Sequence, residues 1–299
     1  MNASVRLLES ALPTSVNLHV AIPAAHPSAQ ILGTERMGSG TLVDPSGLIV
    51  TVNYVALGAE SITVTLVDDT TASGELVAQD FYSGIAIVRI DGGPHPAARC
   101  AAATALQSGQ DIFILASIGH GRRRVSTGVI MSLEPFDAYW EYSLEQGIMT
   151  TALNPGLGGA GLFTASGTLA GVVSLDFNEV GRFTFAIPAE QFTQHRDELL
   201  QHGRRVTRPP RAWVGLYCYV LREHVVVAGV LPGAPGEQAG LKPGDVIISV
   251  DGERVPTRGS LYQRLWQHRP GGVVTFQVFR NNAVKDISVQ TGDAEVFFA

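Results

Sequence analysis

The sequence predicts an all-β fold, because many short apolar segments are separated by residues that favour turns. Glycine occurs 33 times and proline 16 times in 299 residues. Both lie between short segments rich in valine, isoleucine and threonine, a pattern that favours strands over helices. The length indicates about two domains, each large enough to bury a core of its own.

The composition predicts a soluble globular protein without a membrane span. Hydrophobic residues make up 45% and charged residues 16% of the chain, with no apolar run near 18 residues. A net charge of −6 argues against general nucleic-acid binding. Residues 1–10 contain no basic stretch followed by a long apolar core, so no secretory signal is expected. The chain as written is expected in the cytoplasm, and the alternative is a periplasmic protein whose leader was removed.

Two successive sets of candidate strands occupy the first part of the chain. They cover residues 41–43, 48–52, 62–66, 76–78 and 85–90, then 112–116, 125–131, 148–153, 169–175 and 183–187. Pro188 is expected to open a helix at 189–202, with Gly203 as its C-terminal stop. Two successive sets of strands followed by a helix are therefore predicted.

An exposed linker is predicted at residues 204–211, where four arginines and a Pro-Pro pair favour a stiff, solvated segment. The alternative is that these arginines and those at 122–124 bind an anionic partner. Cys100 and Cys218 fall in different predicted domains, so they are expected to be buried free thiols. No metal site and no cofactor are predicted.

Three motifs in the first part of the chain carry a family resemblance. The sequence reads G-S-G-T-L-V-D-P-S-G-L-I-V-T-V-N-Y-V at 38–55, D-F-Y-S-G-I-A-I-V at 80–88 and N-P-G-L-G-G-A-G-L at 154–162. In this order and with these flanks, the chain resembles the HtrA (DegP-like) serine proteases. The resemblance implies a chymotrypsin-like double β-barrel with a cleft between the barrels.

The same resemblance places Tyr54, Gly84 and Gly158 where the family has its catalytic histidine, aspartate and serine. A triad needs a nucleophile, an imidazole and a carboxylate that orients it. Glycine offers no nucleophile, and tyrosine with a pKa of about 10 is a poor base at neutral pH. The sequence therefore predicts a chain that is not an enzyme, in which Gly156, Leu157 and Gly158 form a vestigial oxyanion loop.

A second resemblance begins at residue 213. The sequence reads W-V-G-L at 213–216 and A-G-L-K-P-G-D-V-I-I-S-V-D-G at 239–252, which resembles a PDZ domain of the HtrA type. A PDZ domain adds an extended peptide to a sheet edge and holds its terminal carboxylate with backbone N–H groups. The implied domains are 1–203, 204–211 as linker and 212–299.

The resemblance also implies which residues bind the peptide. The carboxylate would be held by the loop at 213–216, and a pocket beside it would be lined partly by a helix at 260–267. The implied peptide-binding residues are Trp213, Val214, Gly215, Leu216, Leu261 and Leu265. An alternative is a PDZ domain that only packs against its neighbour or mediates assembly.

Four aromatic residues lie among acids at 134–142, in a segment expected to be a loop of the second barrel. Exposed aromatic residues are typical interface anchors, so we expect an intramolecular or partner contact, with local packing as the alternative. HtrA proteins commonly trimerise through aromatic residues near the amino terminus. No Phe, Trp or Tyr precedes Tyr54, so a homo-oligomer is possible while a trimer stays open.

The leading hypothesis is a non-catalytic HtrA-like adaptor, scaffold or chaperone that binds protein carboxyl termini or extended segments. One alternative is a residual or non-canonical serine endopeptidase that uses another serine. Another is a purely structural subunit of a larger enzyme assembly.

Overall fold

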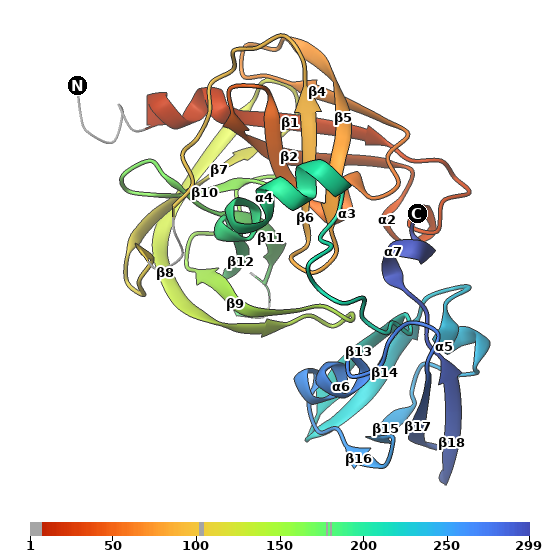
Figure 1. Ribbon diagram of the computed structural model, residues 1–299. Helices are drawn as coiled ribbons and strands as arrows, with labels where there is room; N and C mark the ends of the chain where they lie inside the picture. The colour runs from red at the N-terminus through yellow and green to blue at the C-terminus, as the bar shows by residue number, and fades with distance from the viewer. Residues whose placement is uncertain (1–7, 102–104, 178, 180) are drawn as a thin grey trace. The chain divides into compact units, whose positions relative to one another are not determined.

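The computed structural model describes residues 8–101, 105–177, 179 and 181–299 (Figure 1). The chain forms two compact units. The first comprises the described residues up to Pro135 together with Glu145–Val206, and the second comprises Phe136–Leu144 and Thr207–Ala299. Strands dominate both units, which confirms the all-β prediction.

Six strands of the first unit close into one barrel in the order β1-β2-β3-β6-β5-β4. They are β1 (Ser15–Ala21), β2 (Glu35–Asp44), β3 (Leu48–Val52), β4 (Ser61–Thr65), β5 (Thr71–Asp80) and β6 (Ile85–Ile90). β1 is absent from the strands predicted from the sequence, although Val16, Leu18 and Val20 alternate with polar residues as in a strand. Asn17 is nevertheless buried, and its amide donates a hydrogen bond to the Gly38 carbonyl at 3.2 Å.

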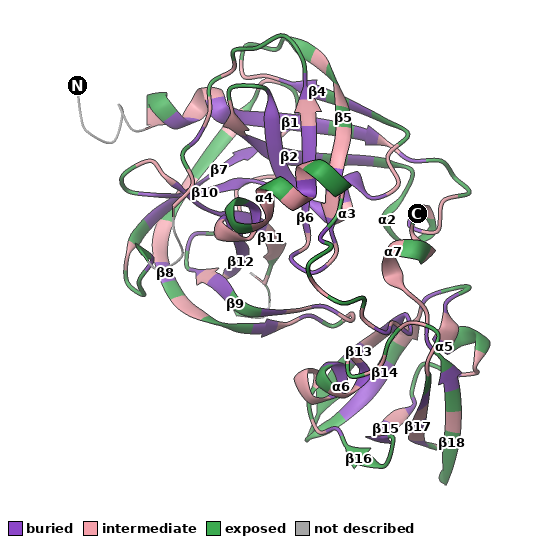
Figure 2. Ribbon diagram, viewed as in Figure 1, coloured by how far each residue is buried: buried purple, intermediate pink, exposed green. Residues whose placement is uncertain are grey.

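Six further strands close the second barrel in the order β10-β11-β12-β9-β8-β7. They are β7 (Asp111–Ser117), β8 (Arg123–Asp137), β9 (Ser143–Thr150), β10 (Gly161–Thr164), β11 (Leu169–Asp176) and β12 (Thr184–Pro188). Apolar side chains such as Ile112, Ile114 and Leu162 fill it. The rings of Phe113 and Phe163, which stack with centroids 5.2 Å apart, belong to a separate cluster with Leu115 and Leu169. Figure 2 shows β1 and β6 mainly in purple, whereas β5 and β8 are mostly pink and green.

The predicted helix is α4 (Glu190–His202), and its predicted glycine stop is confirmed. Gly203 has a φ of 70°, and its N–H donates to the Leu199 carbonyl at 2.9 Å. Pro188 does not open the helix, as the sequence suggested, but ends β12 opposite Gly171. Short helices η1 (Leu12–Thr14), α2 (Ala29–Leu32) and α3 (Asn53–Ala56) complete the first unit.

The second unit is a sheet in the order β13-β14-β15-β17-β18, with β16 paired to β15. Its elements are β13 (Leu216–Leu221), β14 (His224–Val230), α5 (Pro235–Gln238), β15 (Val246–Val250), β16 (Glu253–Arg254), α6 (Arg258–Leu265), β17 (Val273–Arg280), β18 (Ala283–Gln290) and α7 (Ala294–Phe297). Thr257 caps α6 and exchanges hydrogen bonds with Ser260, so the helix begins two residues before the predicted start at 260.

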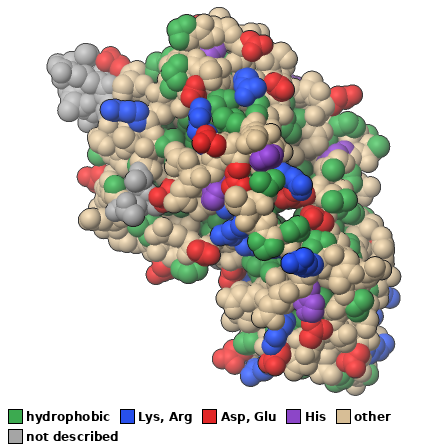
Figure 3. Space-filling view, in the orientation of Figure 1, with side chains coloured by type: hydrophobic (Ala, Val, Ile, Leu, Met, Phe, Trp, Pro, Cys, Tyr) green, Lys and Arg blue, Asp and Glu red, His purple; other side chains and the backbone are tan. Residues whose placement is uncertain are grey.

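Over the described residues, none of the helices combines the length and the hydropathy needed to cross a membrane. Figure 3 shows Lys and Arg side chains interspersed with Asp and Glu on the face in view.

Candidate functional site

The positions assigned to the catalytic histidine and serine face each other in the first unit. Tyr54 lies in α3, and its hydroxyl donates a hydrogen bond to the Ser174 carbonyl at 2.7 Å. A Cβ atom built on Gly158 would overlap that hydroxyl oxygen. The tyrosine ring therefore reaches the space that a side chain at residue 158 would need.

The third position, Gly84, lies in the turn between β5 and β6. Its φ is 79°, a conformation that glycine adopts without strain. Its carbonyl accepts a hydrogen bond from the Asn53 N–H at 2.7 Å, one residue before Tyr54. The fold thus brings the three sequence-predicted positions together.

The predicted oxyanion loop uses part of its hydrogen-bonding capacity within the protein. The Leu157 N–H donates to the Ser117 carbonyl at 3.0 Å, and the Gly156 N–H donates to the Asn154 side-chain oxygen at 3.3 Å. The Gly158 carbonyl accepts from the Ser39 N–H at 2.7 Å. A substrate carbonyl would compete with internal acceptors for the first two of these N–H groups.

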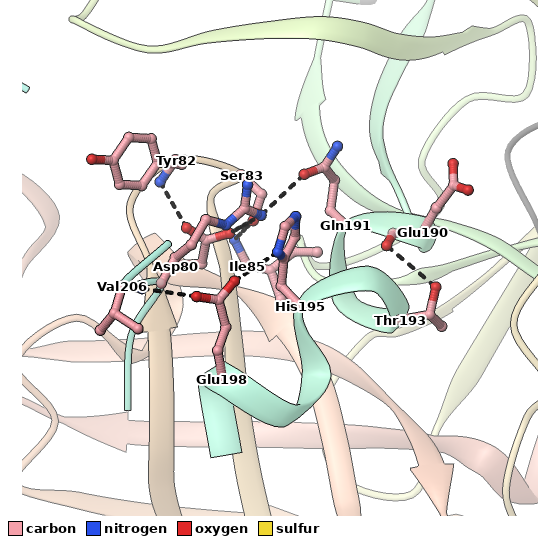
Figure 4. A network of polar contacts seen from close by, with 11 residues as sticks. Asp80, Tyr82, Ser83, Ile85, Glu190, Gln191, Thr193, His195, Glu198 and Val206 are labelled. Atoms are coloured by element: carbon pink, nitrogen blue, oxygen red, sulfur yellow. Dashed lines mark hydrogen bonds and ion pairs between the residues drawn. The ribbon is translucent and has the colours of Figure 1, made fainter. Parts of the chain in front are cut away.

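A buried ion pair lies beside this region and corrects one expectation. Arg205, predicted to be solvated in the linker, is only 4% exposed, and its guanidinium contacts the Asp80 carboxylate at 2.6 Å. Asp80 also accepts hydrogen bonds from the Ser83 hydroxyl and the Tyr82 N–H (Figure 4). Arginine is buried here because a buried carboxylate neutralises it, a long-range pairing that linker composition does not reveal.

In the second unit, three backbone N–H groups converge on the side-chain carboxylate of Glu141. The N–H of Val214 donates to Oε2 at 3.0 Å, and those of Gly215 and Leu216 donate to Oε1 at 2.7 and 2.9 Å. Trp213 takes a different part: its N–H donates to the Gly292 carbonyl at 2.9 Å. The 213–216 loop therefore has the geometry of a carboxylate-binding site, as carboxylates are favoured by convergent N–H groups.

The residues before Glu141 lie along β13 as an additional strand. The Tyr139 carbonyl accepts a hydrogen bond from the Cys218 N–H at 2.5 Å, and Trp140 forms an antiparallel bridge with Tyr217. On α6, the Tyr262 hydroxyl donates to the Ala138 carbonyl at 2.8 Å. Residues 138–141, named here the internal segment, thus bond to both β13 and α6.

The predicted pocket residues lie together. Their exposed fractions do not exceed 2%, and all belong to one hydrophobic cluster: Val214, Leu216, Leu261 and Leu265. The cluster lies under the 213–216 loop and α6 while the internal segment is in place. The sequence did not identify Glu141 as a site residue. It did predict a contact for the aromatic segment at 134–142, which contains Glu141.

Burial changes the acid–base properties of this site. The pKa of Glu141 rises to about 7, because burial disfavours its charged form more than the three N–H groups favour it. Burial also raises the pKa of Cys218 to about 12 and raises that of Tyr262. The thiol is therefore protonated at neutral pH and chemically inert.

Comparison with known proteins identifies both units. Residues 38–172 match the trypsin-like peptidase domain, and residues 192–291 match the PDZ domain. A probable periplasmic serine endoprotease DegP-like of Halomonas elongata is 28% identical over 288 residues, covering 89% of this chain and 59% of that protein. Protease Do-like 1, chloroplastic, of Arabidopsis thaliana is 31% identical over 314 residues, covering 96% of this chain and 71% of that protein.

Solved structures share the fold. A variant of the HtrA-type protease AlgW with a tripeptide has a TM-score of 0.59 at 25% identity, covering 98% of this chain and 97% of that chain. A serine endoprotease from Yersinia pestis has a TM-score of 0.59 at 22% identity, covering 98% of each chain. The chain spans 59% and 56% of the length of two bacterial relatives, from Halomonas elongata and Pseudomonas savastanoi.

These comparisons correct two expectations. The prediction that the chain is not an enzyme is wrong, because the bacterial relatives are named probable serine endoproteases, the Arabidopsis relative is named a protease, and the peptidase match includes Tyr54, Gly84 and Gly158. The cytoplasmic location is unsupported, because the bacterial relatives are named as periplasmic. With a trypsin-like peptidase domain, a PDZ domain and a relative 31% identical over most of its length, the chain belongs to the HtrA (DegP-like) family of serine endoproteases.

Proposed function

We propose that the chain binds protein carboxyl termini through the 213–216 loop and β13, and acts by this binding as an adaptor or scaffold. The observation that carries the proposal is the carboxylate of Glu141, which accepts hydrogen bonds from three successive backbone N–H groups. A free carboxyl terminus presents the same two oxygens.

The neighbouring strand supports the rest of the peptide. β13 is the edge strand of its sheet, so its outer backbone groups can pair with an added chain. The Cys218 N–H already does so with the Tyr139 carbonyl. Main-chain pairing supplies affinity for an extended chain of any sequence, and side-chain pockets beside it supply specificity.

Titration with a labelled peptide tests this function. The probe is a fluorescein-labelled hexapeptide with the sequence of residues 136–140, F-D-A-Y-W, followed by valine with a free carboxyl terminus. The matched control is the same peptide with an amidated terminus, which keeps the strand-pairing groups and replaces one of the two acceptor oxygens by an NH2 donor. We expect fluorescence anisotropy to show binding of the free acid and at least roughly tenfold weaker binding of the amide. Equal binding of the two would refute recognition of the carboxyl terminus.

Serine endopeptidase activity is the second candidate, favoured by the peptidase-domain match and by the names of the relatives. Because Gly158 has no side chain, this activity would need a nucleophilic hydroxyl from another residue. Casein hydrolysis and labelling by a fluorophosphonate test it together. Labelling of one serine, with both signals lost when that serine is replaced by alanine, would establish the activity.

We propose a periplasmic location, which the names of the bacterial relatives support. Fractionation of the source cell tests it, and recovery with cytoplasmic markers alone would contradict it.

A further inference from the structure

The peptide site of the second unit already holds a ligand from the same chain. The internal segment bonds to β13 and α6, and its Glu141 carboxylate accepts from the three N–H groups of the 213–216 loop. An external peptide that uses these N–H groups needs the same space. The two ligands therefore exclude each other.

We propose that the internal segment is a built-in competitor that closes the carboxylate site, and that carboxyl-terminal peptides bind only after it has left. This inference rests on the proposed function, since it concerns access to the same site. It adds a regulatory step, because occupation of the site by the chain itself sets the apparent affinity for any partner.

The contacts imitate a carboxyl-terminal peptide in two respects. The backbone of Tyr139 and Trp140 pairs with β13 as an added strand would. The Glu141 side chain then supplies the carboxylate that a chain end would otherwise supply. The backbone continues past this point, since the Tyr142 N–H donates to the Trp140 carbonyl at 2.6 Å in a tight turn. A side-chain carboxylate is thus the means by which an internal segment fills a site shaped for a chain end.

Aromatic contacts hold the segment in this arrangement. The Tyr139 ring lies 6.1 Å from that of Tyr217 and 4.7 Å from that of Trp140, and Trp140 stacks on Tyr142 at 5.9 Å. Tyr142 is buried, whereas Tyr139 is 49% exposed. The segment is therefore anchored by a few side chains and one carboxylate.

The segment is also placed to transmit its state along the chain. It joins β8 to β9, the neighbouring strands of the second barrel. Departure of residues 138–141 from β13 frees the connection between these two strands. A peptide that displaces residues 138–141 therefore releases the connection between β8 and β9 from its contacts with β13.

The first test compares peptide affinity in Glu141→Ala and in the wild type, with Glu134→Ala as a matched control. Glu134 is an exposed acid on β8, so its replacement removes one glutamate side chain without touching the loop. A segment docked about 90–99% of the time weakens the apparent affinity about 10- to 100-fold. We expect Glu141→Ala to bind the free-acid hexapeptide at least roughly tenfold more tightly than wild type, and Glu134→Ala to match wild type.

The second test closes the site reversibly. Replacing Trp140 and Tyr217 by cysteine places two thiols at bridged positions of adjacent antiparallel strands, where Cα separations suit a disulfide. The native Cys218 and Cys100 do not interfere, because burial raises their pKa values to about 12 and about 11. We expect the oxidised protein to lose peptide binding and the reduced protein to regain it.

The outcomes separate this inference from the proposed function. Equal or weaker binding by Glu141→Ala, or full binding by the oxidised double-cysteine protein, would overturn the competitor while leaving peptide binding in place. If none of the variants binds the free-acid hexapeptide, the proposed function is overturned and the built-in competitor with it. Tighter binding by Glu141→Ala together with a redox-dependent loss supports both.

Discussion

The docked state of the internal segment should weaken as the pH rises through neutrality. Burial raises the pKa of Glu141 from 4.5 to about 7, so the docked segment holds a proton more tightly than the released one. The stability that this proton adds to the docked state is fully present below about pH 4.5 and is lost as the pH rises through about 7. The sign follows from burial, which disfavours the charged carboxylate more than three N–H groups stabilise it.

The size of the effect follows from the two pKa values. Their difference of about 2.5 units corresponds to about 3 kcal/mol over the full range. The docking constant scales as the ratio of 1 + 10^(7 − pH) to 1 + 10^(4.5 − pH), about 30 at pH 5.5 and about 1.1 at pH 8. Docking should therefore weaken roughly 25-fold between these pH values.

Other groups near Glu141 do not reproduce this dependence. Cys218 on β13 and Tyr262 on α6 have pKa values raised by burial, far above the range of the experiment. The other charged groups close to this site are Arg258 on α6 and Asp137 beside the segment, and both act electrostatically on Tyr262. Cys218 and Tyr262 therefore stay protonated between pH 5.5 and 8, whereas the Glu141 carboxyl titrates in this range.

Hydrogen exchange followed by mass spectrometry measures docking without any peptide. Protection of the amides of Val214, Gly215, Leu216 and Cys218, corrected for the intrinsic pH dependence of exchange, should fall roughly 25-fold between pH 5.5 and 8 in the wild type. Glu141→Gln cannot titrate, so its protection should not change with pH, while Glu134→Gln should behave as wild type. Constant protection in the wild type, or the same fall in Glu141→Gln, would refute the reasoning.

Three further predictions concern packing and hydrogen bonds. Arg205→Met should lower the free energy of unfolding by about 3 to 5 kcal/mol, because it removes the charge partner of the buried Asp80 carboxylate. Arg89→Ala, at an exposed ion pair, should lower it by less than about 1 kcal/mol, and denaturant titration measures both. Gly158→Ser should lower the free energy of unfolding by about 1 to 3 kcal/mol, because the new side chain overlaps the Tyr54 hydroxyl, and adding Tyr54→His should restore part of it. If thermal unfolding shows that the losses of the two single variants simply add in the double variant, the contact is contradicted. Tyr262→Phe should loosen the internal segment by roughly 1 kcal/mol and tighten peptide binding about fivefold; unchanged binding would show that this hydroxyl does not hold it.

The parts of the fold that depend on local pattern could be predicted from the sequence. Alternating apolar residues marked most barrel strands, and Gly203 marked the end of α4 by the left-handed backbone it adopts. The alternation of Val16, Leu18 and Val20 also marks β1, which the predicted strands omit, but burial of Asn17 between them depends on its bond to the Gly38 carbonyl of a neighbouring strand. Arg205 was misplaced for the same reason, since its partner Asp80 lies 125 residues away in the sequence.

The carboxylate loop shows the limit of motif reading more sharply. Its sequence at 213–216 predicts convergent N–H groups, but any of the 27 acidic residues could in principle satisfy them. Selection of Glu141, 73 to 75 residues away in the sequence, depends on the tertiary fold. Local periodicity contains no information about such a pairing, whereas the aromatic residues around Glu141 did indicate a contact.

A ligand carried by the same chain sets a condition on every external partner. A tethered group competes at an effective concentration that can reach the millimolar range, so a partner at micromolar concentration needs roughly 1,000-fold stronger intrinsic binding to displace it. One carboxyl terminus making the same three N–H contacts as Glu141 does not gain that factor from the carboxylate alone. The additional affinity must come from side chains that β13 and α6 recognise beyond the internal segment, or from partners that present several termini at once. Selectivity among peptides at this site therefore depends on the internal segment as much as on β13, α6 and the 213–216 loop.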